Sequence, residues 1–336
     1  MKRECRHTYA RDSFLSFLLL AFIGACSDSP SGAAGLERNS GTQADARDTC
    51  DADVCALTFP FQETTSERAK ARTYRLEVAE AGLFAGEASV GSEVCLSKSK
   101  GVTSCLGKGV HAAAAWLTAG RYYVTVTSPA ASEAPVEVSF GFTTSVGAGE
   151  NAMHQDVARA GLQAFSVAFA KHDTEKLIYA VTDYALPSDK KREWVVDLRT
   201  SEVLWHLYVA HGENTSKKSD PNLSATFSNI EGSHQSSLGM MRSAETYTGD
   251  FGYSFRLDGL EPGYNDLVRP RDIVVHPWFG STPKYVEQNH KAAPTFGCPA
   301  VDQGLPKSFF DALSGGVLHW YSFPDGDWSE HTTYRL

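Results

Sequence analysis

Trp194-Val-Val-Asp-Leu198 and Val203-Leu-Trp-His-Leu-Tyr-Val-Ala210 are two apolar runs that flank the turn Arg199–Glu202. Short runs rich in β-branched and aromatic residues and bounded by turn residues are typical of β-strands. A third run, Arg271-Asp-Ile-Val-Val-His-Pro277, predicts an apolar strand that ends near His276. The C-terminal half of the chain is therefore predicted to be rich in β-sheet.

The region Thr49–Phe142 has the period-two pattern of half-buried strands. Tyr74, Leu76 and Val78 alternate with polar residues, and the run Val136–Phe142 does the same. This alternation predicts strands because successive strand side chains point to opposite faces of a sheet. A β-sandwich module over residues 49–145 is therefore expected.

A few short helices are expected among the strands. Asp156–Lys171 places apolar residues near one helical face, and Pro306–Ser314 precedes a pair of glycines that would end a helix. Gly147–Glu150 is a plausible boundary between modules. The predicted fold class is thus mainly β, with a second, β-rich domain over residues 146–336.

The composition argues against one class of partner. The 336 residues include 31 Lys+Arg and 40 Asp+Glu, which gives a formal charge of -9, and no long Lys/Arg run occurs. Neutralising nucleic-acid phosphates requires clustered positive charge, so no nucleic-acid partner is expected. His206, His211, His290 and His319 lack the H-x-x-x-H spacing of metal ligands, and neither a metal nor a cofactor is expected.

The N-terminus predicts export and a lipid anchor. Basic residues precede the apolar run Phe14–Ala25, which is too short to span a bilayer and is typical of a signal peptide over residues 1–25. The run continues into Cys26 in a pattern that resembles a bacterial lipobox, so Cys26 is the expected lipidation site. Residues 26–48 contain few large apolar side chains and are expected to form a flexible tether. The serine after the cysteine favours the periplasmic face of the outer membrane.

Four cysteines lie in the N-terminal module: Cys50, Cys55, Cys95 and Cys105. They allow three pairings, and the short loops favour Cys50–Cys55 with Cys95–Cys105, although spacing alone leaves all three open. Disulfides suit an exported protein. Zinc binding is the weaker alternative because no C-x-x-C occurs.

A histidine at a strand end and a cysteine just after a glycine suggest a catalytic pair. His276 lies near the end of the third apolar run, and Cys298 follows Gly297 in Thr295-Phe-Gly-Cys-Pro-Ala300. In an exported protein these features suggest a thiol nucleophile with an imidazole partner. Taken alone, such a pair more often reflects packing.

Longer strings around these residues carry a family resemblance. They lie between Asp183 and Phe323, and two of them are six or more residues long. The region resembles the murein L,D-transpeptidase catalytic domain family. The strings are Val209-Ala-His-Gly212, Phe227-Ser-Asn229, Gly232-Ser-His-Gln-Ser-Ser-Leu-Gly239, Glu245-Thr-Tyr247, Arg256-Leu-Asp-Gly-Leu-Glu261, Asn265, Ile273-Val-Val-His276 and Gly297-Cys-Pro-Ala300.

The resemblance implies acyl transfer on peptidoglycan stem peptides. Cys298, as a thiolate stabilised by His276, would attack the carbonyl of the third residue of a tetrapeptide stem, release D-Ala and pass the acyl group to an amine. Backbone N–H groups at Gly297 and Cys298 are candidates for the oxyanion hole. Phe296 stands where the wider family has a second histidine, and Ala300 where it often has Asn or Arg, so the acceptor side departs from the family pattern.

Other functions share the same pair or the same fold. An L,D-carboxypeptidase would use water as the acceptor, a cell-wall-binding lipoprotein would have the fold without turnover, and a protease or amidase would have a different groove. The resemblance places His234, Ser236, Ser237 and Gly239 in a loop of the donor groove, with a plain Ser/Gly turn as the alternative. Arg256 and Asn265 are candidates to meet the stem carboxylates, with solvated loop side chains as the alternative, and Thr295, which fits the family pattern, is also expected to bind substrate.

Overall fold

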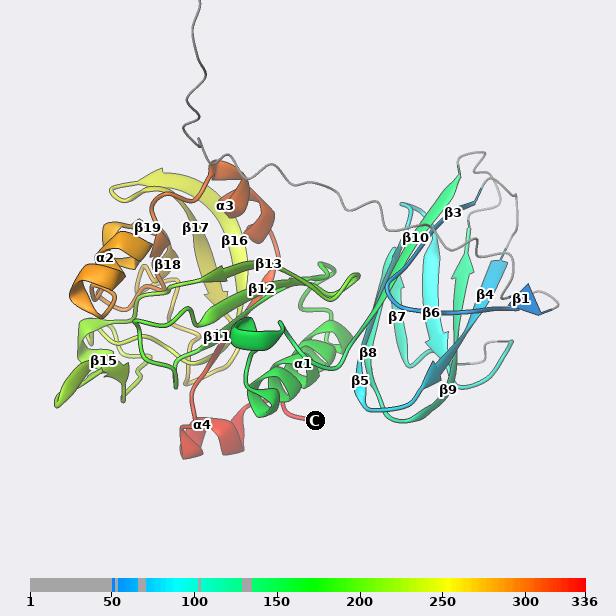
Figure 1. Cartoon of the computed structure of the whole chain (residues 1–336), viewed down its shortest axis with the longest axis horizontal. Coiled ribbons are helices and arrows are strands. Elements are labelled where there is room, and N and C mark those ends of the chain that lie inside the picture. Colours follow the sequence, from blue (N-terminus) through cyan, green and yellow to red (C-terminus); the bar gives the residue numbers. More distant parts are fainter. Residues whose placement is uncertain (1–49, 52–53, 66–70, 102–103, 129–134) are drawn as a thin grey trace, which may run out of the picture. The chain divides into compact units, whose positions relative to one another are not determined.

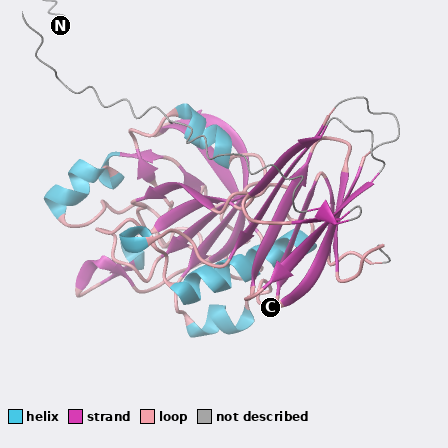
Figure 2. Cartoon of the chain, turned by 45° about the vertical axis from the view of Figure 1, so that its right-hand side comes forward, coloured by secondary structure: helices cyan, strands magenta, loops and turns pink. Residues whose placement is uncertain are grey.

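Strands dominate the chain, as Figure 2 shows. The predicted signal peptide over residues 1–25, the lipidation site Cys26 and the tether over residues 26–48 lie outside the residues that the structure describes. The prediction of a mainly β fold is confirmed. The computed structural model describes residues 50–51, 54–65, 71–101, 104–128 and 135–336.

Two sheets pack face to face in the N-terminal module. The ring of Phe140 in one sheet lies 5.3 Å from that of Tyr74 in the other, between centroids. Tyr74, Leu76 and Val78 are all buried, as their alternation predicts. One sheet has the order β1 (Cys50–Asp51), β2 (Val54–Ala56), β4 (Ala71–Val78), β9 (Gly120–Thr127), β6 (Glu93–Ser97), β7 (Gly107–Val110), and the other β3 (Phe61–Thr65), β10 (Val136–Thr143), β5 (Gly82–Ala88), β8 (Ala112–Leu117).

The cysteines of this module lie on and beside its strands. Cys95 on β6 and Cys105 form a disulfide with an S–S distance of 2.03 Å. Cys55 on β2 is also disulfide-bonded, and the strand pairing sets Cys50 directly opposite it. The connection between β6 and β7 is thus cross-linked close to its base.

A seven-stranded sheet forms the centre of the C-terminal half (Figure 1). Its neighbouring strands are antiparallel except for β11 and β21, which run parallel. Two small sheets, β14–β15 and β19–β20, lie outside it. The large sheet has the order β13 (Glu202–Leu207), β12 (Glu193–Asp197), β11 (Ile178–Asp183), β21 (Leu318–Ser322), β16 (Gly239–Gly249), β17 (Gly252–Gly259), β18 (Val274–Val275), and the small ones contain β14 (Ser216–Lys217), β15 (Asp220–Ser224), β19 (Pro277–Trp278) and β20 (Val301–Asp302).

The third predicted strand, over residues 271–277, is wrong in its extent. Arg271 and Asp272 belong to a turn in which the Arg271 N–H donates to Leu267 O. The run then contributes β18 to the large sheet and β19 to a small one. Proline has no N–H to donate to a neighbouring strand. The pairing with β17 ends at Val275, and after His276 the chain pairs with β20 from Pro277 onward.

The helices are short apart from the one predicted over residues 156–171. That helix, α1 (Gln155–Ala170), begins at His154, whose imidazole accepts a hydrogen bond from the Asp156 N–H. The others are α2 (Pro283–Asn289), α3 (Lys307–Leu313) and α4 (Gly326–His331), with 3-10 turns η2 (Gly149–Asn151), η3 (Glu213–Thr215) and η4 (Phe279–Ser281).

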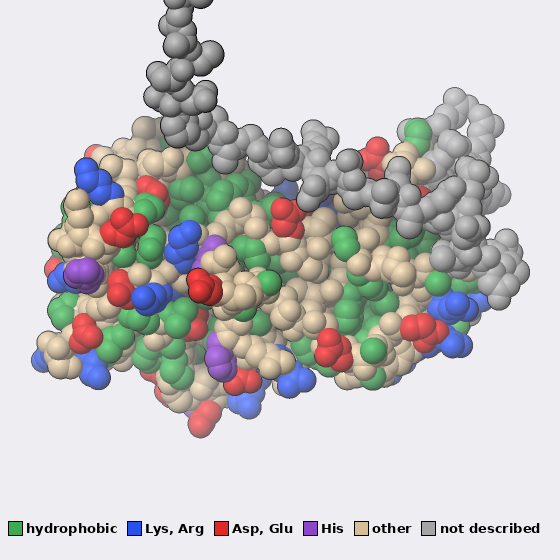
Figure 3. All heavy atoms as spheres, viewed as in Figure 1, with side chains coloured by type: hydrophobic (Ala, Val, Ile, Leu, Met, Phe, Trp, Pro, Cys, Tyr) green, Lys and Arg blue, Asp and Glu red, His purple; other side chains and the backbone are tan. Residues whose placement is uncertain are grey.

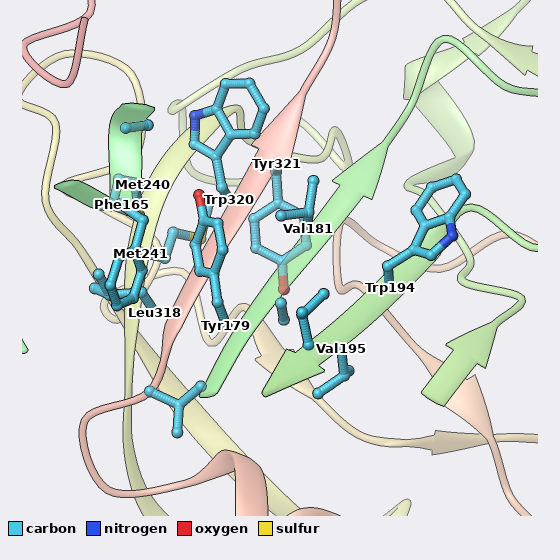
Figure 4. Packing of buried hydrophobic residues seen from close by; sticks show 14 of the residues in the cluster. Phe165, Tyr179, Val181, Trp194, Val195, Met240, Met241, Leu318, Trp320 and Tyr321 are labelled. Carbon is cyan, nitrogen blue, oxygen red and sulfur yellow. The ribbon is translucent and has the colours of Figure 1, made fainter. Parts of the chain in front are cut away.

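Helix α1 covers one face of the large sheet. A Cβ on Gly161 would lie 3.1 Å from the Trp320 ring, so the small residue permits close packing, and the Tyr179 hydroxyl donates to Gly161 O at 3.0 Å. Figure 4 shows this core, including Phe165, Tyr179 and Trp320. The same helix packs on β8, where the Trp116 N–H donates to Ser166 Oγ at 2.8 Å. The predicted boundary near residue 146 precedes a helix whose buried residues share one core with strands on both sides of it.

Acidic and basic side chains are interspersed with apolar ones on the face shown in Figure 3. Among the described residues, no helix is long and apolar enough to cross a membrane.

We expect Glu193→Gln to stabilise the fold at pH 8 by about 1–3 kcal/mol, and by less at pH 5. Glu193 is buried on β12, accepts a hydrogen bond from Thr182 Oγ1 at 2.8 Å, and has its pKa raised by burial to about 7. Because the folded pKa exceeds the unfolded one, ionisation as the pH rises through 7 destabilises the wild type, whereas glutamine keeps the acceptor without the charge. Melting temperatures at both pH values, with exposed Glu202→Gln as control, measure the effect. An equal gain at the two pH values would contradict it.

Candidate active site

Two chain segments run side by side and bring the predicted pair together. The Val274 N–H points at the Cys298 Sγ, 3.5 Å away, and further along the Val301 N–H donates to His276 O at 3.0 Å. Beyond this point Pro277 and Val301 are paired as parallel strands. The structure therefore places His276 and Cys298 on adjacent segments of backbone.

Cys298 is a half-buried free thiol, and the only free cysteine within the described ranges. Its Sγ accepts from the Val274 N–H and lies 3.6 Å from Asp272 O, to which the thiol donates. Burial raises the pKa of the thiol to about 11, and the Val274 N–H and the Arg271 charge oppose that rise without cancelling it. At neutral pH the resting group is therefore a thiol.

His276 is 2% exposed, and one of its ring nitrogens is engaged in a hydrogen bond. Its Nδ1–H donates to Pro277 O at 2.9 Å, which leaves Nε2 as the basic atom of the neutral ring. Phe251 stacks on the ring with 4.4 Å between centroids. Burial lowers the pKa of this imidazole, so it is neutral at pH 7. Both groups of the resting pair are therefore neutral.

The Thr295–Cys298 loop is held by its own polar groups. Gly297 has φ +121, and a Cβ there would lie 2.7 Å from Gln235 O, so both conformation and space require glycine. Its N–H donates to Thr295 Oγ1 at 3.2 Å, and the Thr295 hydroxyl donates to Cys298 O at 2.8 Å. Buried Thr295 therefore braces the loop that carries Cys298, and in this conformation the Gly297 N–H is engaged within the loop.

Ser236 links this loop to a neighbouring one. Its buried hydroxyl accepts from the Gly212 N–H and donates to Gly297 O, both at 3.0 Å. A parallel bridge between Gly212 and Thr295 joins the same segments. Ser236 therefore fixes the position of the loop that carries Cys298.

Three more predicted stem-binding residues are buried supports. Asn265 donates through Nδ2 to Leu238 O and Met240 O and accepts through Oδ1 from the Glu261 N–H. Ser237 is buried and donates to Ser228 O, and Gly239, at φ +99, has no room for a Cβ beside Glu261. Sequence does not show which loops these residues contact, so their structural contacts do not follow from the motifs.

Two predicted residues, His234 and Arg256, remain partly exposed. His234 pairs with Glu213 at 2.7 Å and stacks on Phe296, which is 68% exposed, with 4.2 Å between centroids. Arg256 pairs with Asp272 at 2.9 Å and keeps part of its side chain exposed.

Two arginines at the site were missed from sequence. Arg271 donates to Ser228 O, Ser237 Oγ and Gln235 O, each at 2.7 Å, and its charge lowers the Cys298 pKa. Arg192 is fully buried and reaches Val209 O at 2.9 Å and His211 Nδ1 at 2.7 Å. No spacing signals either role, because both depend on loops that meet only in the fold. Within the described ranges, no three His, Cys, Asp or Glu side chains group as metal ligands would.

A model of the L,D-transpeptidase catalytic domain matches residues 149–321, more than half of the chain. The chain therefore belongs to the L,D-transpeptidase catalytic domain family. The match starts upstream of the region that resembles the family by its motifs and takes in helix α1. Membership supports an L,D-transpeptidase type of function, with peptidoglycan as the substrate.

The remaining comparisons add no functional conclusion. No curated protein matches the chain. The pre-peptidase C-terminal domain of a Bacillus anthracis collagenase is 14% identical, covering 26% of this chain and 92% of that one, with a TM-score of 0.22. PliG, a periplasmic inhibitor of g-type lysozyme from Aeromonas hydrophila, is 14% identical, covering 27% and 96%, with a TM-score of 0.23.

We expect alkylation of Cys298 by iodoacetamide to accelerate about tenfold per pH unit between pH 7 and pH 10. Only the thiolate reacts, and the thiol pKa is about 11. Mass spectrometry measures the rate at which the folded protein gains the alkyl group, and Cys298→Ala serves as the unlabelled control. A rate that levels off near pH 7 would mean that a thiolate already exists beside an imidazolium.

Ser236→Ala should cost about 1–3 kcal/mol of stability, because it strands the Gly212 N–H and the Gly297 carbonyl in a buried site. Turnover should fall further than stability explains, since the loop that carries Cys298 loses its anchor. Urea unfolding and turnover are compared with Ser314→Ala, which removes a hydroxyl near the surface. Unchanged turnover in Ser236→Ala would rule out the positioning role.

Proposed function

We propose that this protein is a peptidoglycan L,D-transpeptidase in which Cys298 is the nucleophile and His276 the base. The observation that carries the proposal is the free thiol of Cys298, held beside the Val274 N–H on a segment that runs alongside His276. Family membership supports the reaction class.

The first half-reaction forms a thioester. His276 Nε2 takes the thiol proton as Sγ attacks the carbonyl of the third stem residue, and the Sγ–C bond forms. The same nitrogen returns the proton to the amine of D-Ala as the C–N bond breaks. With the Gly297 N–H engaged by Thr295, the Cys298 N–H is the donor for the developing oxyanion.

The second half-reaction regenerates the thiol. An amine from a neighbouring stem attacks the thioester, the C–S bond breaks, and the amine's proton passes through His276 to Sγ. Water in place of the amine would give L,D-carboxypeptidase activity. Arg256 and His234, both partly exposed, are the residues proposed to contact the stem.

Export and anchoring form part of the proposal. The apolar run Phe14–Ala25 and Cys26 support a lipoprotein signal, with a diacylated Cys26 holding the protein at the periplasmic face of the outer membrane.

We expect Cys298→Ala to abolish release of D-Ala from tetrapeptide muropeptides, and His276→Ala to lower it by about 10²–10⁴-fold. Mass spectrometry of the products decides among the candidates. Loss of D-Ala with dimers indicates a transpeptidase, loss without dimers a carboxypeptidase, and no change a cell-wall binder. Wild-type turnover in Cys298→Ala would remove this residue as the nucleophile.

A further inference from the structure

A row of aromatic side chains leads away from the catalytic histidine. Phe251 stacks on His276, and its centroid lies 5.5 Å from that of Trp278. Trp278 lies 4.6 Å from Phe279, and Phe279 5.4 Å from Tyr285. The row therefore continues from the tip of the β16–β17 hairpin through β19 and η4 to α2, with His276 at one end.

The row is exposed and held in place. Phe251 is 54% exposed and Phe279 is 47% exposed. The Trp278 ring is fixed by its Nε1–H, which donates to Ala293 O at 3.1 Å, and a Cβ on Gly280 would collide with Ala293 at 2.1 Å. Exposed apolar surface beside a reactive centre marks a place where a ligand is covered on binding.

We infer that this aromatic row binds the glycan strand, the N-acetylated amino-sugar chain that carries the stem peptide. The inference rests on the proposed function, because it extends the same substrate beyond its reacting carbonyl.

The charges around Cys298 favour a sugar over a peptide on the row. A stem peptide carries carboxylates and amines, which suit the partly exposed Arg256 on β17 and the exposed Asp272 in the turn before β18. The row contributes uncharged rings. The C–H groups on the face of a pyranose ring and the N-acetyl methyl groups are uncharged. Both can pack against the face of an aromatic side chain.

Continuity with the reaction centre also favours the glycan. The stem is covalently attached to the glycan, so a stem whose third residue lies at Cys298 brings a sugar chain to the neighbourhood of the site. The row begins at His276 and extends outward over successive rings, as a chain of linked sugars does.

Phe279→Ala tests the inference, because this exposed ring touches neither His276 nor Cys298 in the contacts above. The substrates are a free tetrapeptide stem and the same stem carrying its disaccharide. We expect Phe279→Ala to raise KM for the disaccharide form about three- to tenfold and to leave the free stem unchanged. Leu267→Ala, which removes an apolar side chain of similar exposure (42%) outside the row, should alter neither.

Equal effects on both substrates, or none, would overturn the inference and leave the proposed function standing. A second measurement is independent of turnover: titration of stem-free glycan strands, followed by tryptophan fluorescence, should give a weaker Kd for Phe279→Ala than for wild type and Leu267→Ala. Equal affinities of wild type and Phe279→Ala for the glycan strands would overturn the inference. A change in oligomeric mass on Phe279→Ala, measured by light scattering, with no change in Kd would also overturn it, because the ring would then lie between protein copies. If the wild-type protein turned over neither the free stem nor the stem with its disaccharide, the proposed function would fail. The titration alone would then decide whether the aromatic row binds glycan.

Discussion

The buried hydroxyl of Ser236 is the contact on which the active site depends. It joins the Gly212 N–H to the Gly297 carbonyl, so three segments distant in sequence meet at one oxygen. Apolar burial stabilises the sheet beneath but is non-directional. A hydrogen bond has a direction, and leaving its buried partners unpaired costs more than the bond itself contributes. The position of Cys298 therefore depends on hydrogen bonds that pair the buried polar groups of its loop, and the packed sheet supports that loop from below.

Burial also decides the charge state of the reacting groups. Burial raises the pKa of the Cys298 thiol and lowers that of the His276 imidazole. Forming an ion pair there would take two charges out of water, a cost that attraction between them does not readily repay. Arg271 favours the thiolate but is occupied by Ser228 O and Gln235 O. In the proposed reaction, proton transfer is therefore coupled to attack on the substrate.

Sequence predicts the features that depend on local pattern. The alternation at Tyr74–Val78, the helix near residues 156–171 and the motif around Cys298 all follow from spacing or from strings longer than a few residues. The buried roles of Ser236 and Asn265, and the contacts of Arg192 and Arg271, do not follow from it. Loops lack periodicity, so a polar loop residue looks the same whether it faces substrate or satisfies a carbonyl in the next loop.

The interrupted strand at Val274–Trp278 accounts for much of the chemistry. A continuous strand over residues 271–277 would keep His276 in one ladder, with its side chain fixed to one face. Pro277 has no N–H to donate to β17, and the chain leaves the large sheet after Val275 and pairs with β20. The crossover places the Pro277 carbonyl against Nδ1 of His276, which fixes the tautomer, and brings Trp278 beside the His276 ring. A single short segment thus carries the Val274 N–H that contacts the thiol, the His276 imidazole and the Trp278 ring.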